Sequence, residues 1–171
     1  VMMNAGAYGG EIKDVLKEVT VMDAEGHIIV LPADKLEMVY RTSIIKTAGY
    51  LVLEAVISLE KGREEEIQAK MKELADRRVE KQPLEFPSAG STFKRPEGYF
   101  AGKLIMDSGL GGYRIGGAQV SEKHCGFVIN AGGATAKDVV ELMDHIINTV
   151  KEKFGVTLEP EVRFLGDFDR R

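Results

Sequence analysis

The spacing of apolar residues predicts a chain that changes from strand-rich to helix-rich near residue 61. Residues 15–23 and 27–31 are rich in branched apolar side chains, and the turn-like sequence Asp23-Ala24-Glu25-Gly26 separates them, so we predict a β-hairpin. Residues 49–59 alternate between two faces, which predicts a strand with one buried face. The apolar face of that strand is formed by Leu51, Leu53, Ala55, Ile57 and Leu59.

Beyond residue 61 the apolar period becomes helical. Ile67, Met71 and Leu74 recur at three and four positions, which predicts a helix over 64–79 with a solvated charged face. A second long helix is predicted to start at a capping box, Thr135 to Asp138, and to stop at Gly155. Its apolar positions are Val139, Met143, Ile146, Ile147, Val150 and Phe154.

The region between the two long helices is broken up by proline and glycine. Pro83, Pro87 and Pro96 exclude a helix interior there. We predict a short helix over 100–107, and strands that end at Val120 and span 126–130. Two further strand-like segments, 156–158 and 162–165, follow the last helix.

These elements predict an α+β protein in two parts. A small β-rich piece occupies residues 1–61, and an α+β domain with two long helices packed on a sheet occupies 62–171. Val1 to Met3 resembles the end of a buried strand, and a glycine-rich segment, Asn4 to Gly10, follows it directly. We therefore expect the sequence to be a piece of a longer protein.

Composition narrows the functional classes. The chain has 171 residues, 44% apolar and 29% charged, with a net charge of −4, so it is neither disordered nor suited to nucleic acid. No apolar run approaches the roughly 20 residues of a membrane span. A single cysteine, Cys125, excludes an internal disulfide and favours a reducing compartment such as the cytoplasm.

Glycine is enriched, with 19 residues that cluster near positions 6–10, 109–117 and 132–133. Such clusters form tight turns or let a ligand approach the backbone closely. The spacing in 109–117 does not fit a dinucleotide-binding fingerprint, and no phosphate-binding P-loop is present. His27, His124 and His145 share no metal-ligand spacing, so we predict no metal site.

Three polar segments are candidate catalytic or ligand-binding sites, although the sequence of each is also typical of an ordinary loop. They are Tyr40-Arg41-Thr42-Ser43, the segment 87–96 with Ser91, Lys94 and Arg95, and Glu159-Pro160-Glu161-Val162-Arg163. In the segment 87–96, a hydroxyl lies beside a glycine, and the cationic residues Lys94 and Arg95 follow three and four positions later. This combination suits a phosphate or a carboxylate ligand.

Taken together, five segments resemble the UDP-N-acetylenolpyruvoylglucosamine reductase (MurB) family, in the family's order, from Met3 to about Gly166. They are Met3-Asn4-Ala5-Gly6-Ala7-Tyr8-Gly9-Gly10-Glu11, Tyr40-Arg41-Thr42-Ser43-Ile44, Gly90-Ser91-Thr92-Phe93-Lys94-Arg95-Pro96, Gly112-Tyr113-Arg114-Ile115-Gly116-Gly117 and Leu158-Glu159-Pro160-Glu161-Val162-Arg163.

The resemblance implies an activity, cofactors and a fold. Family members use FAD and NADPH to reduce the enolpyruvyl ether of UDP-N-acetylglucosamine-enolpyruvate to UDP-N-acetylmuramate, in cytoplasmic peptidoglycan precursor synthesis. They are longer at the N-terminus, so this chain is expected to lack the first flavin lobe. It would contain the tail of a two-lobed FAD-binding module, then the substrate-binding domain.

The resemblance also implies roles for individual residues. Ser91 aligns with the proton donor, Arg41 with the arginine that holds the substrate carboxylate, and Glu161 with the catalytic glutamate, which either donates a hydrogen bond when protonated or orients Arg41. These three are expected to converge. The remaining candidates are Gly6, Ala7, Tyr8 and Gly9 beside the flavin, and Tyr40, Lys81, Lys94 and Arg95 on the substrate.

Two alternatives remain open from the sequence. The chain could bind a UDP-sugar without redox activity, or it could be a regulatory nucleotide-binding module that relies on Lys94 and Arg95. Colour separates the first alternative from a flavoprotein, because bound flavin makes a solution yellow.

Overall fold

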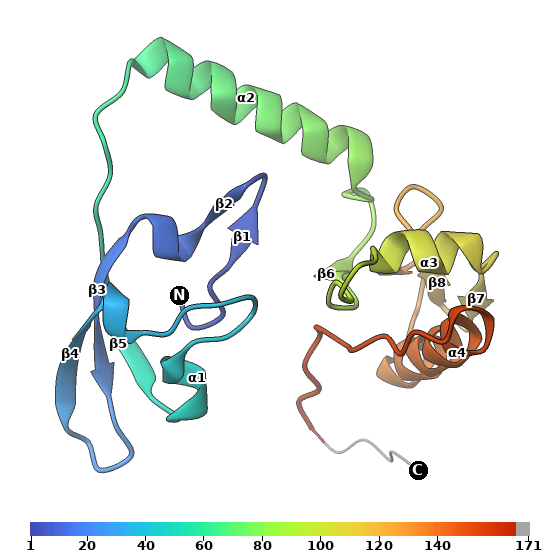
Figure 1. The fold of residues 1–171 in the computed structure, drawn as a ribbon. Coiled ribbons are helices and arrows are strands. Elements are labelled where there is room, and N and C mark those ends of the chain that lie inside the picture. Colours follow the sequence, from blue (N-terminus) through green and yellow to red (C-terminus); the bar gives the residue numbers. More distant parts are fainter. Residues whose placement is uncertain (167–171) are drawn as a thin grey trace. The chain divides into compact units, whose positions relative to one another are not determined.

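A computed structural model describes residues 1–166 of the chain, which falls into two units with separate hydrophobic cores, Val1–Leu74 and Ala75–Arg171 (Figure 1). The division lies within helix α2 (Glu64–Lys81). Antiparallel sheets and helices occur together in one chain, so the predicted α+β class is confirmed. The assignment of residues 1–61 and 62–171 to a flavin module and a substrate domain stays a prediction.

The first unit is built around the hairpin predicted near Asp23. Strands β3 (Leu16–Met22) and β4 (Ile28–Pro32) pair antiparallel, and β5 (Leu51–Ile57) pairs with the other edge of β3, giving the order β4-β3-β5. Two short helical turns, η2 (Ala33–Lys35) and α1 (Ile44–Thr47), follow β4. The core residues of this unit are Leu16, Val19, Val21, Leu36, Met38 and Ile45.

Strand β5 forms as predicted, but of the residues expected on its buried face only Ala55 packs against the core. Leu51, Leu53 and Ile57 are 57%, 48% and 49% exposed, whereas Val52 and Ala55 pack against the core. The reason is a change of register, because Thr20 pairs with Glu54 while the next residue, Val21, pairs with Val52. The extra residue on β5 moves later side chains to the opposite face, so strict alternation fails.

The start of the chain also differs from the expectation of a strand. Residues 2–3 form a turn that is closed by a 2.8 Å hydrogen bond from the Asn4 amide to the Val1 carbonyl. A small hairpin follows, with β1 (Gly6–Ala7) paired to β2 (Gly10–Glu11), and leads into the 3₁₀ turn η1 (Ile12–Asp14).

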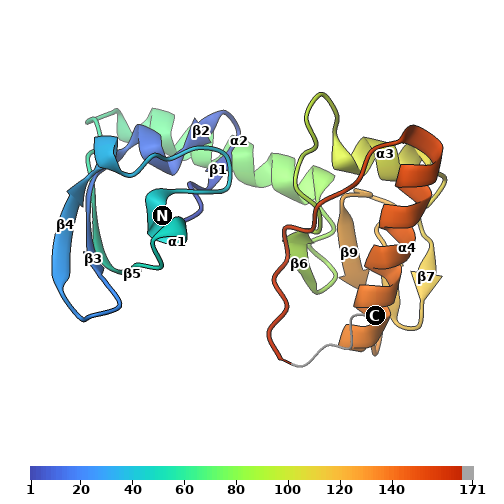
Figure 2. The ribbon, with the colours of Figure 1, turned by 60° about the horizontal axis from the view of Figure 1, so that its bottom comes forward.

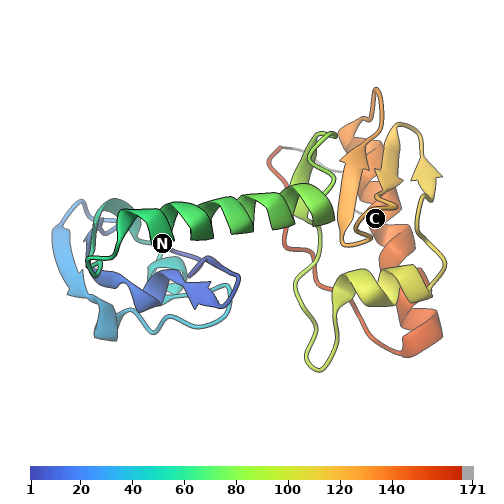
Figure 3. The ribbon, with the colours of Figure 1, turned by 90° about the horizontal axis from the view of Figure 1, so that it is seen from above.

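The second unit contains a four-stranded antiparallel sheet in the order β6-β9-β8-β7. Its strands are β6 (Ser88–Ser91), β7 (Arg114–Ile115), β8 (Ala118–Val120) and β9 (Phe127–Asn130). Figures 2 and 3 show helix α4 (Ala136–Phe154) along one face of this sheet, where it contacts β7 and β8. Helix α3 (Ala101–Asp107) packs against α4.

Helix α4 begins and ends where the sequence predicts. The Thr135 hydroxyl accepts a hydrogen bond from the Asp138 amide, the Asp138 carboxylate accepts one from the Thr135 amide, and Gly155 adopts the left-handed conformation at φ +69°. Its residues Leu142, Met143, Ile146 and Val150 are buried in the core of the second unit.

Two expectations for this part of the chain are wrong. Helix α2 forms over the predicted range, but none of its residues is buried, so its apolar positions Ile67 and Met71 do not pack on a sheet. The segments 156–158 and 162–165 are not strands. Only a single antiparallel bridge, between Phe93 and Pro160, forms in this region.

Candidate functional site

Arg41 lies in a tight turn of the first unit. Val39 and Thr42 form an antiparallel bridge, with amide-to-carbonyl distances of 3.2 and 3.3 Å, and Arg41 between them has a φ of +57°. A non-glycine residue in this left-handed region is strained, and such strain persists only where the surroundings impose it. The guanidinium carbon of Arg41 stands 4.9 Å from the centroid of the Tyr40 ring, so the side chains of these two consecutive candidate residues lie at a cation–π distance.

Asn4 connects this turn to the glycine-rich hairpin, although the sequence did not mark its side chain as a site residue. Its side chain is almost fully buried and donates to Glu11 Oε2 at 3.0 Å and to the Val39 carbonyl at 3.4 Å. Its Oδ1 accepts from the Lys13 amide at 3.0 Å. No local pattern marks such a residue, because its partners lie in β2, in η1 and at Val39, 35 positions along the chain.

The hairpin of Gly6 to Gly10 is exposed and sharply turned. Tyr8 and Gly9 have φ values of +52° and +87°, which are typical of the two-residue turns that suit antiparallel strands. This cluster therefore has a structural reason for glycine. It also fits a ligand that approaches the backbone, because nothing lies within 4 Å of the position that a Cβ of Gly9 would occupy.

Glu11, at the end of this hairpin, is held as a carboxylate. A 2.7 Å ion pair with Lys13 and the hydrogen bond from Asn4 lower the pKa of the Glu11 carboxyl. The same contact with Glu11 raises the pKa of Lys13. The hairpin and the Arg41 turn therefore form one hydrogen-bonded group within the first unit.

Ser91 and Glu161 lie on neighbouring segments of the second unit. Ser91 ends β6 and is exposed, and the next residue, Thr92, accepts a hydrogen bond from the Glu161 amide at 2.9 Å. The Lys94 amide donates to the Glu159 carbonyl at 2.8 Å, so residues 92–94 and 159–161 run side by side (Figure 2). Ser91 and Glu161 are 70 positions apart in the sequence. The fold nevertheless places the Glu161 amide in a hydrogen bond with Thr92, the residue that follows Ser91.

Two of the three basic candidates, Lys94 and Arg95, have contacts within their unit. Lys94 Nζ forms an ion pair with the Glu159 carboxylate. Arg95 places its guanidinium carbon 4.0 Å from the centroid of the Phe100 ring, a cation–π distance, and its Nε donates to the Tyr99 carbonyl at 3.3 Å. Lys81 is exposed at the end of α2.

The candidate residues therefore form two groups, one in each unit. Arg41, Tyr40 and the glycine hairpin belong to the first, whereas Ser91, Glu161, Lys94 and Arg95 belong to the second. Convergence of Arg41 with Ser91 and Glu161 stays a prediction.

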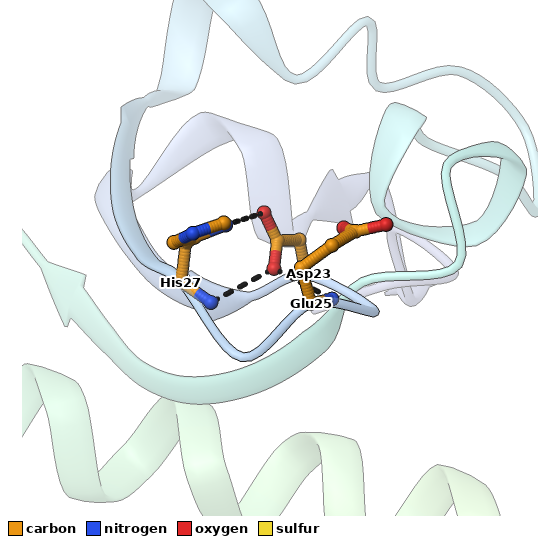
Figure 4. A group of neighbouring side chains, drawn as sticks. All are labelled: Asp23, Glu25 and His27. Carbon is orange, nitrogen blue, oxygen red and sulfur yellow. Dashed lines mark hydrogen bonds and ion pairs between the residues drawn. The ribbon is translucent and has the colours of Figure 1, made fainter.

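A further cluster of polar side chains, Asp23, Glu25 and His27, lies in the β3–β4 turn, with possible ligand atoms within 4.8 Å of one another (Figure 4). Asp23 accepts hydrogen bonds from the amides of Glu25 and His27, at 3.0 and 2.8 Å, and lies 3.0 Å from His27 Nδ1. Burial opposes ionisation of Asp23, but these hydrogen bonds outweigh it and lower its pKa. These hydrogen bonds of Asp23 account for the conformation of the β3–β4 turn.

Cys125 is a free cysteine that is buried in the second unit. Burial raises the pKa of the Cys125 thiol, as expected for an unreactive buried cysteine. Among the described residues, no helix is both long and apolar enough to cross a membrane.

Comparison with known proteins identifies similar sequences and structures. Residues 82–165 match the family model described as UDP-N-acetylenolpyruvoylglucosamine reductase, C-terminal domain. The UDP-N-acetylenolpyruvoylglucosamine reductase of Lachnoclostridium phytofermentans is 65% identical over 167 residues, which are 98% of this chain and 54% of that protein. The protein of the same name from Caldanaerobacter subterraneus subsp. tengcongensis is 57% identical over 167 residues, with 98% and 55% covered.

A solved structure also matches. The crystal structure of UDP-N-acetylenolpyruvylglucosamine reductase (MurB) from Thermus caldophilus superimposes with a TM-score of 0.79 at 37% identity, covering 94% of this chain and 57% of the other. The chain thus spans about half the length of the curated relatives it matches.

Proposed function

This chain belongs to the UDP-N-acetylenolpyruvoylglucosamine reductase family, and from that premise we propose that it supplies catalytic and substrate-binding residues to such a reductase. The proposed reaction is the flavin-dependent, NADPH-driven reduction of UDP-N-acetylglucosamine-enolpyruvate to UDP-N-acetylmuramate. Its proposed place is the cytoplasm, in peptidoglycan precursor synthesis.

The observation that carries the proposal is the hydrogen bond between the Glu161 amide and the Thr92 carbonyl. It keeps the segment that bears Glu161 beside the segment that bears Ser91. A reaction at one small enolpyruvyl group needs its polar groups within hydrogen-bond reach of the same carbons, about 3 Å.

Ser91 is proposed to protonate the substrate carbon next to the carboxylate. A serine hydroxyl is a weak acid, but the carbon becomes strongly basic as negative charge builds up there, and the proton moves only a short distance. Ser91 is exposed, so its hydroxyl can reach a ligand.

Arg41 and Glu161 are proposed to act on the substrate carboxylate and the charge that develops beside it. The permanent positive charge of Arg41 attracts this group more strongly as negative charge accumulates, which stabilises the transition state more than the ground state. Glu161 either donates a hydrogen bond in its protonated form or orients Arg41, because an ionised carboxylate would repel the developing charge.

The hairpin that contains Gly6, Ala7, Tyr8 and Gly9 is proposed to hold the flavin. Its open backbone at Gly9 and its exposure fit close approach by a flat ligand. When bound, the flavin would supply the hydride that NADPH provides.

The diphosphate of the substrate is proposed to lie against Lys81, Lys94 and Arg95, with Tyr40 contributing from the first unit. Lys94 forms an ion pair with Glu159, so a diphosphate would have to compete with that carboxylate for the ammonium group. The planar guanidinium of Arg95 offers two parallel hydrogen bonds to a phosphate.

A second candidate function is UDP-sugar binding without reduction. It is favoured by the location of Ser91, Lys94, Arg95 and Glu161, which all fall within the residues that match the family's C-terminal domain. Titration of a full-length protein that contains this sequence with UDP-sugar, in parallel with FAD, separates the two. Binding of the sugar nucleotide alone would favour the second function.

The test of the reductase proposal is Ser91→Ala in a full-length enzyme that contains this sequence. We expect flavin reduction by NADPH to be almost unchanged and the enolpyruvyl step to slow about 10²–10⁴-fold, the usual loss of a general acid. Stopped-flow absorbance measures both half-reactions separately.

Ser88→Ala is the matched control, because Ser88 is an exposed serine of the same strand whose hydroxyl accepts only the Gly90 amide, at 3.4 Å, among the bonds described. It should leave both half-reactions intact. Equal slowing of both steps by Ser91→Ala would refute its role as the proton donor.

A further inference from the structure

Thr92 connects three separate segments of the second unit. It is a polar residue with only 3% of its surface exposed, and its amide, its carbonyl and its hydroxyl oxygen each form a hydrogen bond. Its amide donates to the Gly126 carbonyl at 2.9 Å, and its carbonyl accepts from the Glu161 amide at 2.9 Å. Its hydroxyl oxygen accepts from the Val128 amide, also at 2.9 Å.

The irregular pairing of β6 explains why a hydroxyl is needed here. Ser88 pairs with Ile129 and Ser91 pairs with Phe127, so three steps along β6 match only two along β9. Gly90, within this irregularity, has a φ of +81°. After this irregularity, the Thr92 hydroxyl oxygen accepts the hydrogen bond of the Val128 amide in β9. The Thr92 carbonyl accepts a hydrogen bond from the Glu161 amide.

A valine in place of Thr92 would have nearly the same shape but no acceptor. The buried Val128 amide would then lose its partner, and an unsatisfied buried donor costs more than the lost hydrogen bond alone. Residues 91–93 would have to shift to let water or another acceptor reach that amide. Such a shift moves Ser91 and loosens the bond to Glu161.

We propose that Thr92 is a positioning residue that sets Ser91 and Glu161 at a fixed separation by bonding to β9 and to the Glu161 segment at once. The inference rests on the proposed function for its catalytic consequence, but its structural part can be measured without any activity. Thr92 touches neither substrate nor cofactor in this assignment; it acts through its two neighbours.

The first measurement is amide hydrogen exchange by NMR on the 171-residue chain. Thr92→Val should raise the exchange rates of the Val128 and Glu161 amides about three- to tenfold, the range expected when one buried hydrogen bond is lost. Thr92→Ser keeps the hydroxyl and should restore both rates. The amides of α4, such as those of Ile146 and Val150, should not change in either variant.

Thr149→Val is the matched control. It removes a threonine hydroxyl from the same unit, one that donates to the His145 carbonyl at 2.8 Å within α4. It should leave the exchange of Val128 and Glu161 at the wild-type rate. A uniform increase in exchange across the unit in Thr92→Val would mean general destabilisation and would overturn a local positioning role.

The second measurement is steady-state kinetics of the full-length enzyme. Thr92→Val should lower kcat for enolpyruvyl reduction about 10- to 100-fold, as expected for a small misplacement of reacting groups. The KM for the UDP substrate and the rate of flavin reduction should stay near wild type, and Thr92→Ser should recover kcat. An unchanged kcat, or a change confined to KM, overturns the proposal.

If Thr92→Val does not fold, the wild-type chain still decides the structural part. Slow exchange of the Glu161 and Val128 amides supports the inference, and exchange as fast as that of an exposed loop amide overturns it. Failure of the reductase assignment would appear differently, as an absence of activity in the wild-type enzyme alongside intact protection of these two amides.

Discussion

At the scale of single residues, Gly117 shows how closely two backbones approach in the second unit. A Cβ at this position would lie 2.3 Å from the Ala134 nitrogen and 2.4 Å from the Gly132 carbonyl oxygen. Both neighbours are backbone atoms, so they cannot rotate away as a side chain can. Gly117 also bonds to this region, since its carbonyl accepts from the Ala131 amide at 2.9 Å.

We predict that Gly117→Ala lowers the free energy of unfolding of the second unit by about 1–3 kcal/mol, the usual cost of overpacking. Gly111→Ala is the control, because a Cβ there would meet only Cys125 Sγ at 3.5 Å, an ordinary contact. Urea denaturation followed by circular dichroism measures both variants. A similar loss in the two variants would contradict the steric explanation.

At the scale of elements, α4 depends on a charged cap that also ties it to the β7–β8 turn. The Asp138 carboxylate accepts hydrogen bonds from the Thr135 amide at 2.9 Å and the Gly117 amide at 3.3 Å. These bonds, the one from Thr135 first, lower the pKa of Asp138 below its ordinary value of 3.8. The ionised form is therefore the one that the folded state favours.

The sign of the resulting pH dependence follows from this lowered pKa. The stabilisation by Asp138 is fully present above the ordinary pKa of 3.8 and is lost as the pH falls through the lower, folded-state pKa. We predict that Asp138→Asn lowers the Tm of the second unit at pH 7, and that this difference shrinks progressively below pH 3.8. Calorimetric scans over a pH series measure it.

Asp144→Asn is the control for the helix cap. Asp144 is an exposed carboxylate in the middle of α4, away from the capping box. Its replacement should change Tm little at any pH in the series. A difference between Asp138→Asn and wild type that stays constant down to the lowest pH would argue against the ionised cap.

At the scale of the whole molecule, each unit has a core of its own, and the candidate residues are divided between them. The first core is formed on the β4-β3-β5 sheet and the second under α4. The proposed flavin hairpin and Arg41 depend on the first core, whereas Ser91 and Glu161 depend on the second. The proposed reductase reaction requires both groups of residues at one substrate.

We predict that the 171-residue chain binds FAD weakly or not at all. The chain spans 54% of the length of the Lachnoclostridium phytofermentans relative, and the hairpin it offers to a flavin is exposed. The measurement is flavin absorbance after gel filtration of the chain mixed with FAD. The full-length relative, treated in the same way, is the positive control; a stoichiometric yellow complex of the 171-residue chain would refute the prediction.

The sequence by itself determined the elements whose stability is local. Helix α4 was predictable because its capping box, its apolar period and its terminal Gly155 all act within a few turns of one helix. The β3–β4 hairpin was predictable for the same reason, since the turn signal Asp23 to Gly26 marks it. The five family-like segments likewise indicate the family whose C-terminal domain model matches residues 82–165.

Only the tertiary structure decided the features that depend on partners far along the chain. Strand β6 forms in a segment that the sequence presents as a polar loop, because β9 offers it an edge. The face of β5 that is buried depends on a bulge against β3, and the left-handed Arg41 depends on the bridge across its turn. The approach of Ser91 to the Glu161 segment results from hydrogen bonds at Thr92, and no local pattern encodes a contact between residues 70 positions apart.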